Sequence, residues 1–456
     1  MVRWLRSPLP MLDRLAATYG STFSLRVPRM KQPMVFFSDP AAIKEIWAGD
    51  PETMRAGEAN VILRAALGPG SLLLLDGERH LRERRLMLPP FHGDRMRAHG
   101  ATMRDATLQH LATWPLARAF PIHGAMQAIT LDVIMQTIFG ITDNLDPLHD
   151  ALVRWTTLAT SRLGTALLLL VPPEHARQVQ ELAAGGLGRY LPWAPIVRAQ
   201  RDTDRLVRSV IAERRRQALA DRTDILSMLL AARDEHGQPM TDDQLRDEML
   251  TLLLAGHETT ATTLAWAIHH LLANPRWLAR VRAEIDEVVG VGGLVTTEHL
   301  AKLVLLDAAI KETLRLTPIV PLVARVVTQP TRIGNYTLPE GAIACASIYL
   351  VHHRADLWAE PKRFDPSRFV DTKPDPTHYF PFGGGTRRCL GMAFATYEMK
   401  VILATILAHL DLAPAQNTRV RLVRRGITLA PSGGMPVVAT RRPGAEDALT
   451  RVRDVS

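Results

Sequence analysis

The sequence predicts a mainly α-helical protein with small β-sheets, an α+β fold in a single domain. Apolar residues recur at helical spacing through most of the chain. One such pattern runs from Thr241 to Asn274, which at 1.5 Å per residue would form a helix of about 50 Å. Short runs of β-branched and aromatic residues stand apart from the helical patterns and predict only small sheets. A helix of about 50 Å can cross the whole molecule.

The predicted helices are bounded by residues that favour helix ends. Thr241 and Gln244 match a capping box at the start of the long helix, and Pro275 marks its expected end. Gly, Pro and Asn separate the other helical patterns. Those patterns cover residues 39–48, 95–112, 124–139, 147–160, 200–219, 223–234, 298–316 and 392–409.

Strands are predicted in three parts of the chain. The first part is 22–37, interrupted by Pro28 and Pro33. The others are short runs at 322–328, 332–338 and 342–349, and pieces near 418–440. Because no internal repeat or low-complexity linker divides the sequence, residues 1–440 are expected to form one domain. Residues 441–456 are charged and contain Pro and Gly, which predicts a disordered tail.

Composition and charge narrow the class of protein. The net charge of +9 is compatible with a nucleic acid, an anionic membrane or an acidic protein partner. The basic residues are scattered, however, and runs such as Arg82 to Arg85 lack interleaved aromatics, which argues against nucleic acid. No apolar stretch approaches the ~20 residues that span a bilayer, and the N-terminus lacks the apolar core of a signal peptide. Two cysteines in dissimilar surroundings predict no disulfide, so we expect a cytoplasmic protein.

The most specific segment is 382–391, FGGGTRRCLG, which precedes a predicted apolar helix. Its glycines let the backbone approach another group closely. Cys389 lies at the start of that helix, where free N–H groups and the helix dipole favour a thiolate. A thiolate there can ligate haem iron, and nearby N–H groups can tune its potential. Cys345, inside an apolar run, is instead expected to be a buried small hydrophobe.

This segment resembles, position for position, the haem-binding loop of cytochromes P450. The shared pattern is a Phe, two residues, a Gly, one residue, an Arg, one residue, a Cys, one residue and a Gly. The resemblance implies haem b, iron protoporphyrin IX, between the long helix and this loop, with Cys389 as the axial iron ligand. It also implies haem contacts for Phe382, Gly383 and Gly391, and a propionate contact for Arg387.

A polar interruption, AGHETT at 255–260, stands in the long apolar helix. Its His-Glu pair could suggest a zinc-protease HExxH motif, but the second histidine position is Ala261, so the ligand count fails. A structural alternative is that Thr259 and Thr260 bond to the preceding helical turn, with Glu258 solvated.

Together with the cysteine loop, however, the interruption resembles the oxygen-activating helix of the same family. The resemblance implies that Ala255 and Gly256 leave room for dioxygen beside the iron. It implies that Glu258 and Thr259 position water and relay protons to the distal oxygen. Such an acid-alcohol pair favours reaction with O2 and two electrons over reaction with peroxide.

A charged pair lies in the helix predicted at 298–316. Glu312 and Arg315 are three residues apart, so they share one face of a largely apolar helix. Most such pairs are exposed and contribute little, but apolar neighbours favour burial. The family carries ExxR here, joined by a downstream arginine, and Arg363 in Pro361-Lys362-Arg363-Phe364 is interpreted as that third member. Lys362 departs from the more common glutamate of that motif. The implied role is structural support for the cysteine loop.

Three further basic residues match positions that contact haem propionates. His80 and Arg84 are four residues apart and face the same way on a helix. On spacing alone, a solvated basic helical turn is the favoured interpretation. The resemblance assigns both to propionates and adds Arg325, whose planar guanidinium suits a carboxylate.

The resemblance implies a monooxygenase that catalyses RH + O2 + 2 e⁻ + 2 H⁺ → ROH + H2O. The apolar segments expected to form the pocket predict a small hydrophobic substrate, with a terpenoid or fatty acid as the natural guess. Electrons are expected from a separate ferredoxin or flavodoxin with its NAD(P)H-dependent reductase. The protein is expected to be a monomer without a membrane span. The alternative function is a haem-binding sensor or carrier without turnover, which would need no proton relay.

Overall fold

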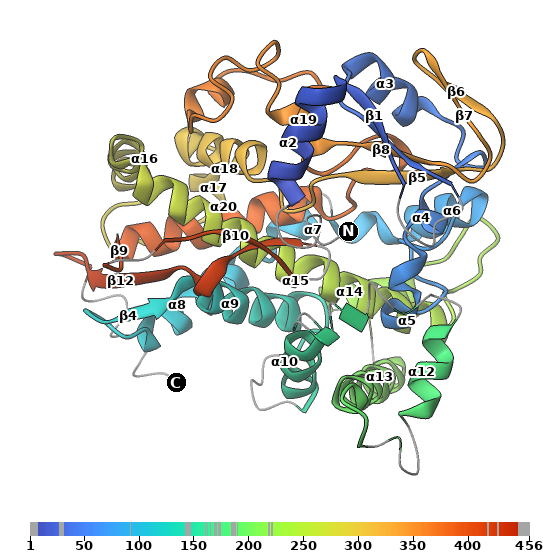
Figure 1. Ribbon diagram of the computed structural model, residues 1–456. Coiled ribbons are helices and arrows are strands. Elements are labelled where there is room, and N and C mark those ends of the chain that lie inside the picture. The colour runs from blue at the N-terminus through green and yellow to red at the C-terminus, as the bar shows by residue number, and fades with distance from the viewer. Residues whose placement is uncertain are drawn as a thin grey trace.

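A computed structural model describes residues 8–445 of the chain. Within that range it leaves out 27–31, 92, 142–146, 160, 162, 165, 168–170, 172–174, 184–187, 189, 218, 220–221, 417–418 and 426–427. Figure 1 shows a mostly helical molecule, with the long helix α15 (Asp242–Ala273) running through its middle and small sheets at its edges. The mainly helical fold expected from the sequence is confirmed.

Helix α15 begins as the capping pattern predicts. The Thr241 side chain accepts a bond from the Gln244 N–H at 3.2 Å, and the Gln244 side chain accepts one from the Thr241 N–H at 2.8 Å. These bonds satisfy two amide groups that a helix start would leave unpaired. At the other end, Pro275 opens a new helix, α16 (Pro275–Val288), because proline is tolerated in the first helical turn.

Six helices pack around α15 or against each other to build the main core. Helix α9 (Ile122–Thr137) lies along α15, and α10 (Pro147–Ala159) packs on α13 (Ala194–Arg215). Helix α20 (Met392–His409) contacts α8 (Gly100–Thr113), α18 (Val304–Leu316) and α15. The packed faces carry fully buried Leu, Ile, Val and Met residues, whose burial is the main favourable term in folding.

The main sheet joins strands from distant parts of the chain. Its order is β1 (Thr22–Leu25), β2 (Met34–Phe37), β8 (Ile343–Ala346), β5 (Val323–Val327) and β3 (Met54–Arg55). Strands β2 and β8 are parallel, with Phe36 opposite Cys345, whereas the other neighbours are antiparallel. Cys345 is fully buried, and burial raises the pKa of its thiol, as expected for a structural cysteine.

Smaller sheets and short helices complete the described fold. The sheets pair β6 (Thr331–Ile333) with β7 (Tyr336–Leu338), β10 (Leu422–Arg425) with β11 (Thr428–Pro431), and β12 (Pro436–Arg441) with both β4 (Ala119–Pro121) and β9 (Leu410–Pro414). The remaining helices are α2 (Pro8–Tyr19), α3 (Pro40–Ala48), α4 (Ala56–Ala59), α5 (Arg64–Leu67), α6 (Gly77–Met87), α7 (Gly93–Arg97), α12 (Ala176–Leu182), α14 (Ile225–Ala231), α17 (Thr297–Leu300) and α19 (Ile348–His352). The 3₁₀ turns are η1 (Val61–Leu63), η2 (Pro89–Phe91), η5 (Pro366–Phe369), η6 (Gly385–Arg387) and η7 (Ser432–Gly434).

Several boundaries differ from the sequence-based expectation. The helix expected at 298–316 is divided into α17 and α18, and the strand expected at 342–349 ends at Ala346, before α19. Helices α2 and α16 were not predicted, and α16 begins at Pro275, which was interpreted only as the end of the long helix. Arg441 ends β12, and Arg442 pairs with Asp286 at 2.7 Å, so the chain remains packed beyond residue 440. The rest of the expected tail, 446–456, lies outside the described residues.

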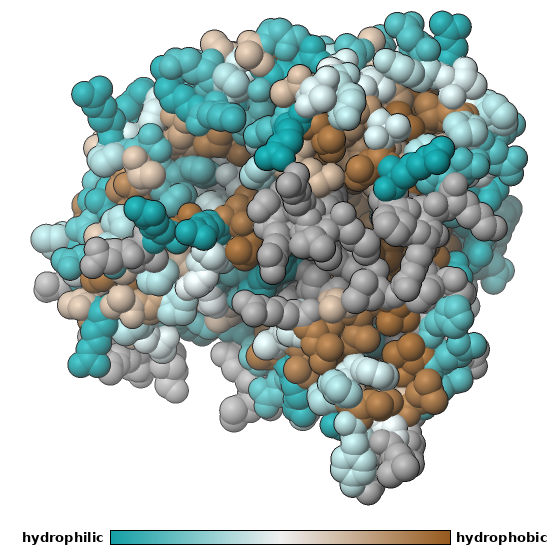
Figure 2. Space-filling model, in the orientation of Figure 1, coloured by the Kyte–Doolittle hydropathy of each residue, from teal (hydrophilic) through white to brown (hydrophobic). Residues whose placement is uncertain are grey.

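Among the residues that the structure describes, no helix is both long enough and apolar enough to cross a membrane. Figure 2 shows hydrophobic side chains gathered on one face, over the region of α5, α12 and α13. Leu182 of α12 is exposed. Such a patch is a common mark of a binding surface or the mouth of a ligand site.

His270, near the end of α15, should make stability depend on pH. Burial lowers its pKa from 6.5 to about 3, while its Nε2 lies 2.8 Å from the Thr317 hydroxyl. The unfolded chain therefore binds a proton below pH 6.5 that the folded chain cannot bind, so stability falls as the pH drops from 6.5. Wild type should lose free energy of unfolding between pH 6.5 and 5. We expect His270→Gln to reduce that loss by about 2 kcal/mol. Urea unfolding at several pH values checks this, with exposed His236→Gln as control. Parallel pH curves for wild type and His270→Gln would contradict it.

Candidate active site

Cys389 lies in the turn between η6 and α20. Its backbone N–H donates to the Phe382 carbonyl at 2.9 Å, which closes the loop, and the Gly391 N–H donates to its sulfur. The side chain is exposed, and yet burial raises the pKa of the thiol, against the opposing effects of Gly391, Arg84 and Arg388. The two findings agree if the sulfur faces a hollow inside the protein. The helix start favours the thiolate as expected, but burial outweighs that effect here.

The loop glycines are required by their neighbours and by their backbone angles. Gly383 and Gly385 have backbone φ angles of 69° and 63°, which residues with a side chain rarely adopt. A Cβ on Gly384 would lie 2.5 Å from the ring of Trp47 on α3, and one on Gly385 would lie 2.5 Å from the Trp47 carbonyl oxygen. A Cβ on Gly391 would meet no atom within 4 Å. The close approach expected of the glycines therefore involves Trp47, while Gly391 borders open space.

Basic side chains from three elements converge beside this loop. His80 and Arg84 come from α6, Arg325 from β5 and Arg387 from η6. Burial lowers the pKa of His80 to about 3, helped by the charges of these three arginines, and the His80 Nδ1 has no partner among the described residues. Burial, with Arg387 as the next cause, lowers the pKa of Arg325 to about 10. So much positive charge in a buried place favours an anion there.

Arg387 already has partners within the protein. It pairs with Asp76 at 2.5 Å and donates to the Leu72 carbonyl at 3.3 Å and to the Leu75 carbonyl. Asp76 also accepts the Gly57 N–H at 2.8 Å, so the arginine braces the segment before α6. The described residues offer no carboxylate within ion-pair distance of Arg84 or Arg325. An acidic ligand with two carboxylates, such as haem, fits this donor set.

In the middle of α15, small and polar residues are more exposed than the residues on either side of them. Ala255 is exposed and Thr259 half-buried, although they lie inside the molecule's central helix. A Cβ on Gly256 would come within 3.2 Å of Ile134, so this glycine serves packing on α9. Thr259 donates its hydroxyl to the Ala255 carbonyl at 2.6 Å, as the structural alternative expected. The described part of the chain contains no group of three or more His, Cys, Asp or Glu side chains that could hold a metal ion.

Glu258 is buried, not solvated. Its Oε2 accepts the Gln127 amide at 2.6 Å, and its Oε1 lies 3.5 Å from the Thr262 hydroxyl and 4.0 Å from Arg425. Burial raises the pKa of Glu258, while Arg425, Gln127 and Thr262 lower it in that order. The sequence did not single out Gln127 or Arg425, because neither belongs to a motif.

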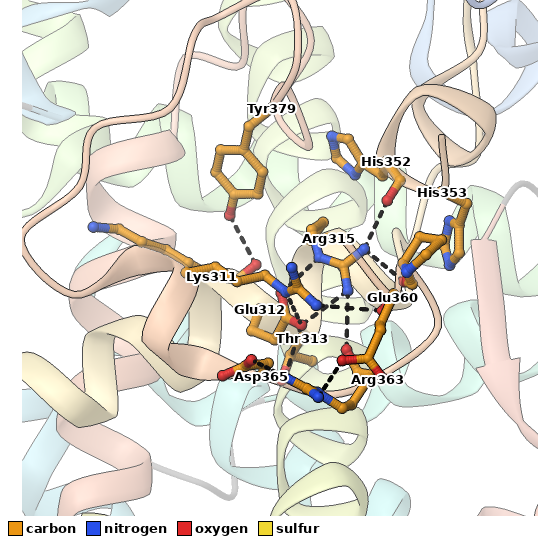
Figure 3. A network of polar contacts seen from close by, with 12 residues as sticks. Lys311, Glu312, Thr313, Arg315, His352, His353, Glu360, Arg363, Asp365 and Tyr379 are labelled. Atoms are coloured by element: carbon orange, nitrogen blue, oxygen red, sulfur yellow. Dashed lines mark hydrogen bonds and ion pairs between the residues drawn. The ribbon is translucent and has the colours of Figure 1, made fainter. Parts of the chain in front are cut away.

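The pair expected in α18 forms a buried ion-pair core (Figure 3). Arg315 and Glu312 are wholly buried and make two bonds, at 2.6 and 2.8 Å. Arg315 also donates to the carbonyls of His352 at 2.7 Å and Pro361 at 2.8 Å. The ring of His352 accepts the Phe380 N–H at 3.0 Å. The pair is thereby connected to the chain just before the cysteine loop.

The expected third member, Arg363, is wrong. Its side chain is 56% exposed and pairs with Glu360 and with Asp365, the latter at 2.7 Å (Figure 3). Only its carbonyl contacts the core, at 3.3 Å from Arg315. The cation that approaches Glu312 is Arg368, at 3.4 Å, with 13% of its side chain exposed. A second Pro-x-Arg-Phe sequence, at 366–369, was the signal that could have identified it.

Comparisons with known proteins agree with this geometry. Residues 4–437 match the model of the Cytochrome P450 family. Cytochrome P450 135B1 of Mycobacterium tuberculosis is 39% identical over 452 residues, which covers 98% of this chain and 91% of the relative. Cytochrome P450 138 of the same organism is 35% identical, over 95% and 92% of the two chains. A cyanobacterial CYP120A1 with retinoic acid bound superposes with a TM-score of 0.81 at 25% identity, covering 96% of this chain and 97% of that one.

The chain therefore belongs to the cytochrome P450 family. Like the family, it binds haem and is a monooxygenase, which uses O2, a substrate and a redox partner. The P450 fold expected from the sequence is confirmed, and a P450DA haem domain with a TM-score of 0.83 at 24% identity shares it.

Arg368 and Arg363 make a matched pair of variants for the ion-pair core. Arg368→Ala should cost about 1–3 kcal/mol, because it removes a cation that compensates the buried Glu312 carboxylate. Arg363→Ala should leave stability nearly unchanged, since its ion pairs are solvated. Chemical unfolding of the two variants tests this assignment. A larger loss of stability for Arg363→Ala than for Arg368→Ala would show that Arg363, not Arg368, is the third member of the core.

Proposed function

We propose that this P450 inserts one oxygen atom from O2 into a small hydrophobic substrate, a terpenoid or a fatty acid, using electrons from a separate partner. The observation that carries the proposal is that Cys389 faces inward and that buried basic side chains lie beside its loop. The apolar patch near α12 and α13 supports a hydrophobic substrate. So does the solved relative that binds retinoic acid, a terpenoid acid.

The cofactor would be held by its iron and its two carboxylates. Cys389 would supply the axial thiolate, with the Gly391 N–H bonded to the sulfur. His80, Arg84 and Arg325 would bind the propionates. Arg387 would support this arrangement by its ion pair with Asp76, which holds the segment before α6 in place. Phe382, Gly383 and Gly391 would shape the loop that faces the macrocycle. The haem, when bound, supplies the redox chemistry that activates O2.

The residues of α15 would handle dioxygen and protons. The small side chain of Ala255 would leave room next to the reacting oxygen, while Gly256 would let α15 pack closely on α9 at the same level. Burial raises the pKa of Glu258, which favours its protonated form and suits a group that takes up and passes on a proton. Thr259 would take that proton on its hydroxyl and pass it on, once its bond to the Ala255 carbonyl rearranges. A sensor or carrier would have no use for this pair.

Loss of the thiolate should be visible in the spectrum. We expect the dithionite-reduced protein with carbon monoxide to show a strongly red-shifted Soret band, since a thiolate pushes electron density onto the iron. Cys389→Ser should lose that band, and Cys345→Ser should keep it, because Cys345 is buried in the sheet. A band typical of histidine ligation in folded wild type would show that Cys389 does not ligate the iron.

A ferredoxin or flavodoxin with an NAD(P)H-dependent reductase would supply the electrons to a monomeric P450. The net charge of +9, with Arg388 exposed beside the cysteine, suits an acidic partner. The rate of reduction by such a partner should therefore fall severalfold between about 0.05 and 0.5 M salt, as screening shortens the range of attraction. Reduction by a small uncharged reductant serves as control. Equal rates at both salt concentrations would exclude electrostatic docking.

A further inference from the structure

The Glu258 carboxylate is turned toward α9, and its bonds hold it there. Both oxygens are engaged, Oε2 by the Gln127 amide at 2.6 Å and Oε1 by the Thr262 hydroxyl at 3.5 Å. The Thr259 hydroxyl, its intended partner in proton relay, donates instead to the Ala255 carbonyl. Neighbouring residues on a helix point about 100° apart, so Glu258 cannot serve Thr259 from its present position without leaving Gln127.

A short chain of polar groups fixes the other oxygen. The His123 Nε2 lies 3.0 Å from the Thr262 hydroxyl and 3.7 Å from the Glu258 Oε1. If Thr262 donates to Glu258, then His123 must donate to Thr262. Burial lowers the pKa of His123 to about 4, so its ring is neutral at working pH and suits that role. The hydroxyl is thereby set to favour an ionised Glu258.

One permanent charge faces Glu258 within the described structure. Arg425 of β10 is 4.0 Å from Oε1 and 30% exposed, so this side of the carboxylate lies near solvent. The remaining titratable neighbours are His123 of α9 and His257 of α15, and burial lowers the pKa of both to about 4. The His257 Nε2 bonds to the Gln127 carbonyl at 3.0 Å, which helps to keep the backbone of Gln127 in place.

Resting on the roles proposed above for Glu258 and Thr259, we propose that Gln127 is a positioning residue for proton delivery. Its amide holds the Glu258 carboxylate against α9 and within 4.0 Å of the partly exposed Arg425, where the carboxylate takes up a proton from water that enters beside Arg425. Protonation weakens the bond, because Gln127 donates to a carboxylate better than to a neutral acid. The neutral side chain then swings to Thr259 and donates its proton to the hydroxyl oxygen, as that hydroxyl releases its own proton toward the reacting oxygen. Glu258 returns as the carboxylate to Gln127.

Two substitutions at Gln127 separate this role from simple packing. Gln127→Leu removes the donor at similar volume, and Gln127→Glu places a second carboxylate beside Glu258. Thr130→Val is the matched control: it breaks a bond of 3.3 Å to the His257 carbonyl between the same two helices and one of 3.3 Å to the Gln127 carbonyl within α9, and it leaves Glu258 untouched.

The first readout is the titration of Glu258 itself in the haem-loaded protein. Infrared difference spectra follow its protonated C=O stretch, which is identified by its loss in Glu258→Gln. We expect the midpoint to rise by on the order of one pH unit in Gln127→Leu, which loses a bond to the charged form, and by more in Gln127→Glu. Thr130→Val should titrate like wild type. The second readout is the share of NADPH electrons lost as hydrogen peroxide, which should rise severalfold in both Gln127 variants.

Unchanged midpoints in both Gln127 variants would overturn the inference, and so would an equal shift in Thr130→Val. A wild-type spectrum without any band that Glu258→Gln removes would also overturn it. Failure of the proposed function has a different signature: wild type would lack the red-shifted carbon monoxide band or NADPH-linked product. The infrared titration needs no turnover, so it decides the role of Gln127 in either case.

Discussion

The buried pair between Glu312 and Arg315 is the interaction on which the architecture around Cys389 depends. A buried charge is costly unless its hydrogen bonds are complete. Here Arg315 reaches the carbonyls of His352 and Pro361, and the Glu312 Oε1 also accepts the Asp365 N–H at 2.9 Å. The pair thus draws the end of α19 and the connection that follows it onto α18, and the His352 ring links them to Phe380, just ahead of the cysteine loop.

Burial and charge are opposed throughout the site. At Cys389, burial raises the pKa of the thiol, which keeps it protonated until a metal displaces the proton. At His80 and Arg325, burial lowers the pKa and makes an incoming carboxylate more favourable. The apoprotein is therefore arranged to release a proton at one end of the site and to accept negative charge at the other.

The sequence predicted the helical fold, the capping box and α20 to the residue, because these depend on local periodicity and end signals. Motif spacing also located Glu258, Glu312 and Arg315. It failed for the third arginine, since two similar sequences lie five residues apart and only tertiary packing shows that Arg368, not Arg363, reaches Glu312. Gln127 and Arg425 could not be found, because their contacts with Glu258 join residues more than one hundred positions apart.

The packing of Trp47 against Gly384 and Gly385 bears on the order of assembly. The tryptophan belongs to an early helix and the glycines to the loop near the other end, more than three hundred residues later. Loop closure over such a distance is slow, and non-local contacts form late in folding. During synthesis Cys389 therefore leaves the ribosome well after Trp47, and the cysteine loop can take its final packing only when these two distant parts of the chain meet.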